Sequence, residues 1–138
     1  MRGIATLVEL ARRDADERRA ALARIGDAKA NADAARAMHE KQQLSEANMA
    51  TNDPAILATV DAWSHHTRRV GQALSARCAE LGRQEEVARD ALRLAFVGMK
   101  RLQIARDNGF ERERLAALRR ADIRASEAFA LVHLRGIA

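Results

Sequence analysis

The chain has 138 residues, of which 48% are hydrophobic and 31% charged, with three Phe, one Trp and no Tyr. Much of the apolar content is alanine, which suits closely spaced helices and argues against a thick globular core built from large side chains. The length is that of one domain, residues 1–138. No apolar run approaches the roughly 18 to 20 residues that a membrane span needs, so we expect no direct membrane insertion.

The sequence divides into two stretches of helix formers with one short break between them. The stretches cover residues 3–50 and 55–135, and the break at 51–54 contains the only proline. Asp53 suits a helix N-cap and Pro54 the first helical position, where a missing N–H costs nothing. Because the break is short, the sequence predicts an all-α fold, a long antiparallel two-helix coiled-coil hairpin.

Apolar and small residues recur about every 3.5 positions in both arms, as the packing face of a coiled coil requires. We call this face the seam. In the second arm the predicted seam comprises Ile56, Val60, Trp63, Thr67, Val70, Leu74, Arg77, Leu81, Gln84, Ala88, Ala91, Ala95, Gly98, Leu102 and Ala105. In the first arm it comprises Ile4, Val8, Ala11, Ala15, Leu22, Ile25, Ala32, Ala35 and Met38, with an interruption at Arg18. Small residues on both seams bury little area per turn, so we expect modest stability.

The second arm is longer than the first. Folding the chain about residue 53 pairs position 4 with about position 102, which leaves roughly the last 30 residues without a partner from their own chain. There the apolar pattern continues one residue out of step, at Leu115, Leu118, Asp122, Ala125, Phe129 and Val132. The step falls near Asn108-Gly109, where either a bend or a continuous helix fits the sequence. Residues 55–66 likewise either begin the second arm or form a separate helix ended by Ser64-His65-His66.

Positive charge is concentrated at the C-terminal end. Residues 98–138 hold nine Lys or Arg against five Asp or Glu, whereas the two signs nearly balance over residues 1–97. Acidic residues are interleaved with the basic ones, and the region lacks a motif of glycine and aromatic residues of the kind that binds nucleic acid. This pattern favours a solvated coiled-coil face over a nucleic-acid site, so we expect a protein partner and no nucleic acid.

No group of residues indicates catalysis, a metal site or a cofactor. His65 and His66 are adjacent and point about 100° apart on a helix, so they cannot bind one metal ion as an i,i+4 pair does. The single cysteine, Cys78, cannot form an intramolecular disulfide and favours a reducing, cytoplasmic location. A glycine-rich phosphate loop is also missing from the sequence. We expect a protein that is not an enzyme.

Three segments of the sequence follow a pattern seen in one family of helical hairpins. They are Thr6-Leu7-Val8-Glu9-Leu10-Ala11 with Asp14 and Glu17-Arg18-Arg19, Val60-Asp61-Ala62-Trp63 with Val70 and Leu74, and Lys100-Arg101-Leu102-Gln103 with Arg106. With these segments the chain resembles the FliJ family, the central stalk and general chaperone-like component of the flagellar type III export apparatus. That family is related to the stalk proteins of injectisomes.

The resemblance implies a monomeric, non-enzymatic stalk in the cytoplasm, peripheral to the membrane export apparatus. The implied partners are a hexameric export ATPase, the cytoplasmic region of the export gate, and export chaperones. The resemblance implies gate contacts at Met38, Gln42, Trp63, Thr67, Val70 and Leu74. It implies contacts with the ATPase ring at Lys100, Arg101, Arg106, Arg112, Arg119 and Arg120. For Trp63, Val70 and Leu74, packing within the seam is an equally good interpretation.

Two other functions stay open from the sequence. The chain fits a generic coiled-coil adaptor or secretion chaperone that dimerises through its seam, and less well a basic helical protein that binds nucleic acid. A monomer favours the stalk and an obligate dimer favours the adaptor. The sequence does not choose between a flagellar and an injectisome system.

Overall fold

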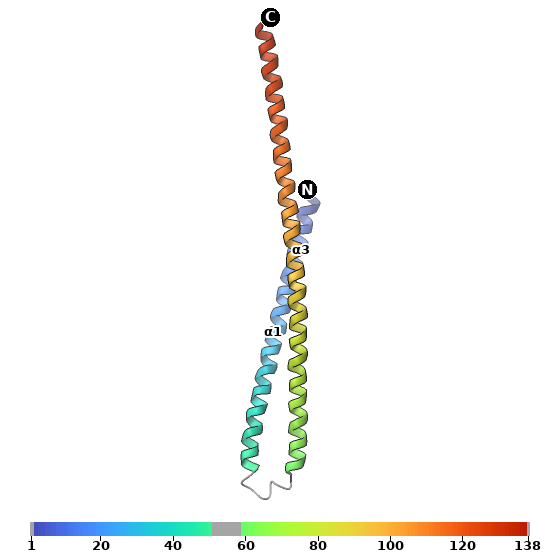
Figure 1. Cartoon of the computed structure of the whole chain (residues 1–138), viewed down its shortest axis with the longest axis vertical. Helices are drawn as coiled ribbons and strands as arrows, with labels where there is room; N and C mark the ends of the chain where they lie inside the picture. The colour runs from blue at the N-terminus through green and yellow to red at the C-terminus, as the bar shows by residue number, and fades with distance from the viewer. Residues whose placement is uncertain (1, 51–58, 138) are drawn as a thin grey trace. The chain divides into compact units, whose positions relative to one another are not determined.

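The computed structural model describes residues 2–50 and 59–137, and these two ranges contain two long α-helices. Helix α1 spans Arg2–Ala50 and helix α3 spans Val60–Ile137 (Figure 1). No strand occurs in the two described ranges. The predicted all-α hairpin of two long helices that pack against each other is confirmed.

Three of the four predicted helix ends lie within two residues of the observed ones. At the fourth, α3 begins at Val60, and both the predicted start at residue 55 and the predicted break with Asp53 and Pro54 lie outside the described residues. Residues 60–66 belong to α3, so Ser64-His65-His66 does not end a helix. The helix also continues without interruption through Asn108-Gly109.

Contacts group the chain into two compact units, and each helix contributes to both. One unit is Asp16–Leu94, and the other combines Met1–Ala15 with Ala95–Ala138.

In the unit Asp16–Leu94 the helices run antiparallel. Three pairs of neighbours establish the direction: His39 lies beside Gly71, Lys29 beside Gly82, and Glu85 beside Gly26. The midpoint between the two residue numbers of each pair lies near residue 55, whereas folding the chain about residue 53 was expected. In this unit a residue of α1 therefore meets a residue of α3 about four positions later than expected.

The seam of α3 agrees with the prediction from Val60 to Leu74, and beyond it Leu81, Ala88, Ala91, Ala95 and Leu102 are also buried or half-buried as predicted. The predicted positions Arg77, Gln84, Gly98 and Ala105 are exposed. Their successors Cys78, Glu85, Met99 and Arg106 are buried or half-buried instead. The prediction was wrong at these four positions because a straight α-helix drifts by about 20° per heptad against a 3.5-residue count. Two successive steps of four residues, from Val70 to Leu74 to Cys78, absorb the drift.

Helix α1 shows the same drift. The predicted seam residues Ile4, Val8, Ala11, Ala15, Leu22, Ile25 and Ala32 are buried or half-buried. The last two predicted positions, Ala35 and Met38, are wrong, since both are exposed and His39 faces α3 in their place.

The core is thin. Among the described residues, the buried hydrophobic side chains are Val8, Ala15, Ala32, Cys78, Leu81 and Met99. In the unit Asp16–Leu94, Ala32, Cys78 and Leu81 form one cluster, with Ala28 packed against it. Burial raises the pKa of the Cys78 thiol, and the neighbouring Asp33 carboxylate raises it further. Few large apolar side chains are buried, so we still predict modest stability.

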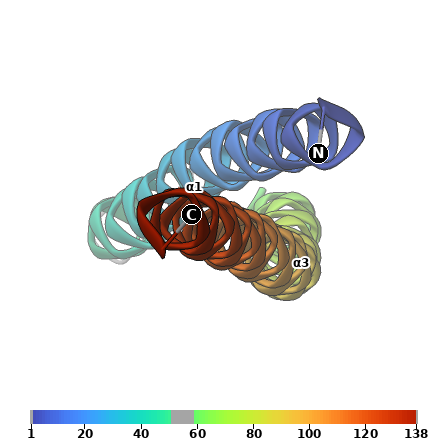
Figure 2. The same ribbon diagram turned by 90° about the horizontal axis from the view of Figure 1, so that it is seen from above.

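The C-terminal part of α3 makes little contact with the rest of its own chain. Every side chain from residue 117 to residue 136 is exposed. Figures 1 and 2 show this segment, in red, as a regular helix. Neither described helix contains an apolar stretch that is long enough to cross a membrane.

Candidate protein-interaction surfaces

A groove of about 360 Å³ lies between α1 and α3 around Trp63, within the unit Asp16–Leu94. Its lining includes four of the six residues proposed for gate contact, namely Gln42, Trp63, Thr67 and Val70. The other two lie elsewhere: Leu74 is half-buried in the seam, and Met38 is 63% exposed. The structure thus brings four of the six together.

Two hydrogen bonds join the helices at this groove. Trp63 Nε1 donates to Glu46 Oε2 over 2.6 Å, and His39 Nε2 donates to the main-chain oxygen of Thr67 over 3.1 Å. Thr67 itself is only 5% exposed. Trp63 and Thr67 therefore contribute to the packing of the hairpin as well as to the groove.

No contact was predicted from the sequence for His39 or for Glu46. The two residues are seven positions apart, so they occupy the same place in successive heptads of α1. This seven-residue spacing was the feature of the sequence that could have indicated that both side chains face α3. It becomes informative only when the pairing of α1 with α3 is known.

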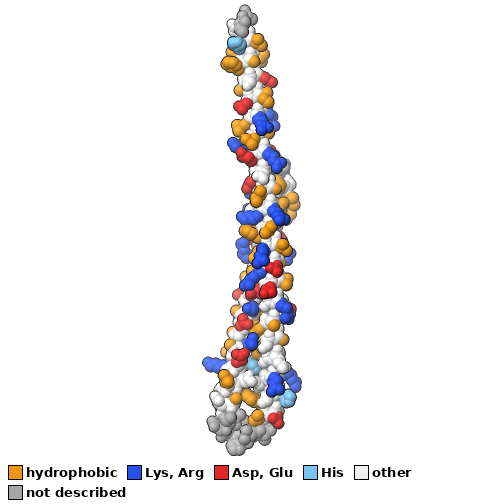
Figure 3. Space-filling model, in the orientation of Figure 1, with side chains coloured by type: hydrophobic (Ala, Val, Ile, Leu, Met, Phe, Trp, Pro, Cys, Tyr) orange, Lys and Arg blue, Asp and Glu red, His pale blue; other side chains and the backbone are white. Residues whose placement is uncertain are grey.

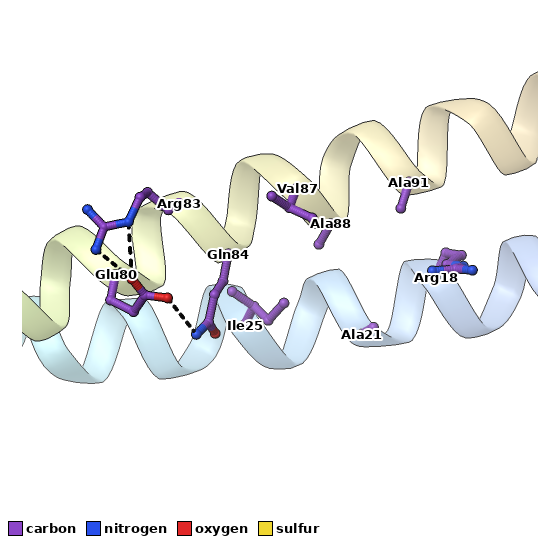
Figure 4. A pocket seen from close by; sticks show the side chains of 9 residues that line it. All are labelled: Arg18, Ala21, Ile25, Glu80, Arg83, Gln84, Val87, Ala88 and Ala91. Carbon is purple, nitrogen blue, oxygen red and sulfur yellow. Dashed lines mark hydrogen bonds and ion pairs between the residues drawn. The ribbon is translucent and has the colours of Figure 1, made fainter.

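A second groove, of about 450 Å³, was not predicted (Figure 4). Ala21 on α1 faces Ala88 and Ala91 on α3, and such small side chains fill little of the space between the helices. At its edge, Glu80 accepts hydrogen bonds from Arg83 Nε at 3.1 Å and from Gln84 Nε2 at 3.3 Å. These bonds lower the pKa of the Glu80 carboxyl group.

The six cations proposed for contact with the ATPase ring point in different directions around α3. With 3.6 residues per turn, residues that are seven or eleven positions apart share a face of a helix. Arg101, Arg112 and Arg119 share one face by this rule, and we call it the arginine face. Lys100, Arg106 and Arg120 lie on other faces, so the fold brings three of the six together.

The arginines of the arginine face are exposed and make no ion pair or hydrogen bond with any described residue. By contrast, Arg106 Nε lies 3.2 Å from Asp107 Oδ1, and Lys100 Nζ lies 5.3 Å from the centroid of the Phe96 ring. The arginine face is therefore an unneutralised cationic surface that an acidic partner can bind.

Beside the arginine face runs an exposed and mostly apolar surface, which we call the C-terminal seam. It consists of Leu115, Leu118, Asp122, Ala125, Phe129 and Val132, all of them exposed. Figure 3 shows hydrophobic, basic and acidic side chains interspersed on the visible face of this part of α3. At its end the Phe129 ring stacks on His133, with centroids 6.3 Å apart.

The described residues contain no cluster of three or more His, Cys, Asp or Glu side chains that would hold a metal ion. Comparison of the chain with protein families, curated proteins and solved structures finds no match. The two surfaces of α3, one cationic and one apolar, are thus the main guide to function.

Proposed function

We propose that the chain is a non-enzymatic stalk and chaperone-like component of the flagellar type III protein export apparatus. One observation carries the proposal: the C-terminal part of α3 exposes cationic and apolar side chains and makes little contact with its own chain. Apolar surface of this kind marks a site of protein interaction. The resemblance of three segments of the sequence to the FliJ family names the partner.

In this proposal the C-terminal part of α3 enters the ring of the hexameric export ATPase. The arginine face meets acidic side chains at the interfaces between ring subunits and favours assembly and turnover of the ring. The groove around Trp63 contacts the cytoplasmic region of the export gate. The chain works in the cytoplasm at the periphery of the membrane apparatus, where it also meets export chaperones.

Binding to the two main partners tests this function directly. The purified full chain is expected to retain both the export ATPase and the cytoplasmic gate domain in a pull-down, and to stimulate ATP hydrolysis by the ATPase. Retention of neither protein at low ionic strength, where charge attraction is strongest, would reject the proposal.

A second candidate function is a coiled-coil adaptor or secretion chaperone that acts as a dimer. The 3-4 spacing of exposed residues along the C-terminal seam favours it, because such spacing suits packing against another helix. Sedimentation equilibrium of the chain alone separates the two candidates. The stalk is a monomer, whereas the adaptor is a dimer.

A further inference from the structure

The C-terminal seam is bordered by basic and neutral side chains only. In heptad notation its six residues occupy a and d positions, with Leu115, Asp122 and Phe129 at a. The e positions along one edge are Arg112, Arg119, Ser126 and His133. The g positions along the other edge are Arg114, Ala121, Ala128 and Arg135. The acidic residues Glu113 and Glu127 fall at f positions, on the opposite face of the helix.

These edges disfavour a second copy of the chain as the occupant of the C-terminal seam. Residues at e and g positions of two packed helices face one another and set partner choice. In a parallel pair Arg114 would face Arg119 of the other copy, and in an antiparallel pair it would face Arg135. Arg114 already pairs with Glu111 at 2.6 Å, but neither edge offers an acidic residue to a copy of itself.

Asp122 adds a second requirement, because it lies in the middle of the C-terminal seam. A partner helix that covers the seam removes water from this carboxylate, which is costly unless a cation or a hydrogen-bond donor replaces the water. A polar residue at a single a position also fixes the register of two packed helices. A Lys or Arg side chain opposite Asp122 supplies both a cation and a hydrogen-bond donor, so it meets this requirement best.

We propose that the C-terminal seam binds one amphipathic helix of a different protein, whose edges are acidic and which presents a Lys or Arg side chain to Asp122. The inference deepens the function proposed above by stating the chemistry of the partner. It rests on the exposed seam and its basic edges, and it holds for a partner outside an export apparatus as well.

Designed helical peptides test the edges. One peptide carries Leu at a and d positions, Glu at e and g positions, and one Lys at the position that meets Asp122. A second peptide carries Lys at e and g positions and is otherwise identical. In fluorescence anisotropy with the full chain, the acidic peptide is expected to bind at least about tenfold more tightly than the basic one. Equal affinities would overturn the inference.

The site on the chain is tested with matched charge reversals. Arg112→Glu together with Arg119→Glu changes one edge, whereas Arg120→Glu together with Arg124→Glu makes the same charge change at f and c positions. The edge variant is expected to lose roughly tenfold in affinity for the acidic peptide, and the control much less. Equal losses would show attraction to net charge alone and would overturn the inference. Circular dichroism verifies that both variants keep their helices.

The register is tested at Asp122. A third peptide, with Glu in place of the facing Lys, is expected to bind Asp122→Lys better than the original peptide does, an inverted preference of roughly tenfold. Glu127→Lys makes the same charge change on the opposite face and should leave the preference unchanged. A preference that does not invert, or a stable dimer of the unmodified chain formed through the C-terminal seam, would overturn the inference.

The peptide experiments test this inference independently of the proposed export function. If the acidic peptide binds as expected while the export ATPase and gate domain do not bind, the inference stands and the proposed function falls. If the full chain stimulates the ATPase but binds all the peptides equally well, the proposed function stands and the inference falls.

Discussion

His39 reaches from α1 to the main-chain oxygen of Thr67 in α3, to which its Nε2 donates a hydrogen bond of 3.1 Å. The imidazole lies over Gly71, where an added Cβ would stand 3.4 Å from Nε2. That distance is ordinary van der Waals contact, so a methyl group fits beside the imidazole. We expect a larger side chain to displace it. The contact between the two helices thus depends on a small residue at position 71.

The effect of a Gly71 substitution on stability is expected to depend on the size of the new side chain: a small one stabilises the chain and a large one destabilises it. Gly71→Ala should stabilise the chain by about 0.5–1 kcal/mol, because alanine is the better helix former. Gly71→Leu should destabilise it by about 1–3 kcal/mol, because the longer side chain displaces His39. Urea unfolding followed by circular dichroism measures both.

The control for position 71 is Gly98, where an added Cβ meets nothing within 4 Å. Gly98→Ala and Gly98→Leu should therefore both stabilise the chain. If Gly71→Leu were as stable as Gly71→Ala, His39 would not pack against α3 in the way described.

Two leucines of α3 test which residues face α1. Leu81 is 6% exposed in the small core, and Leu94 is 74% exposed. Leu81→Ala is expected to cost about 2–4 kcal/mol of unfolding free energy, because it removes buried methyl groups and leaves a cavity. Leu94→Ala should cost less than about 0.5 kcal/mol. Similar costs for the two substitutions, measured by urea unfolding, would contradict the observed seam.

The two-helix fold was predictable because its signals are local. Helix formers fill both arms, and the lone proline at position 54 marks the interval between them. The seam of α3 was predicted correctly from Val60 to Leu74 and again at Leu81, Ala88, Ala91, Ala95 and Leu102. Arg77, Gln84, Gly98 and Ala105 were each predicted one residue too early, since a count of 3.5 residues per turn departs from the true helical period.

The candidate surfaces were less predictable than the fold. Helical spacing alone places Arg101, Arg112 and Arg119 on one face, so the arginine face follows directly from the sequence. The contacts of His39 and Glu46 do not, because they depend on a pairing centred near residue 55. An error of a few residues in that centre moves every contact between the helices by a full turn.

The stability of the chain should fall in acid partly through Glu80. Hydrogen bonds from Arg83 and Gln84 lower its pKa below the ordinary value of 4.5. A carboxyl group with a lowered pKa stabilises the folded state above the ordinary value and loses that contribution as the pH falls toward the folded-state pKa. Glu80→Gln should therefore lower the melting temperature at neutral pH and have a smaller effect below pH 4.5. An effect that is the same at both pH values would contradict the pKa shift.

The Cys78 thiol should react slowly with a thiol reagent in the folded chain. It is 7% exposed, and its burial raises its pKa, so less of the reactive thiolate is present at a mildly alkaline pH. The rate of modification by a disulfide reagent is expected to rise on unfolding in urea to that of free cysteine. A folded-state rate equal to the unfolded rate would place Cys78 outside the core.

Charge reversal on the arginine face tests the proposed export function at its most specific point. Arg101→Glu, Arg112→Glu and Arg119→Glu together should weaken binding to the export ATPase by roughly tenfold or more and reduce its stimulation, because three unpaired cations are lost from one face. The matched control combines Lys100→Glu, Arg106→Glu and Arg120→Glu, which changes the net charge equally on other faces. Circular dichroism should report full helicity for both triple variants, since all six side chains except the half-buried Arg106 are exposed. If the two variants lose stimulation equally, net charge alone governs binding and the arginine face has no separate role.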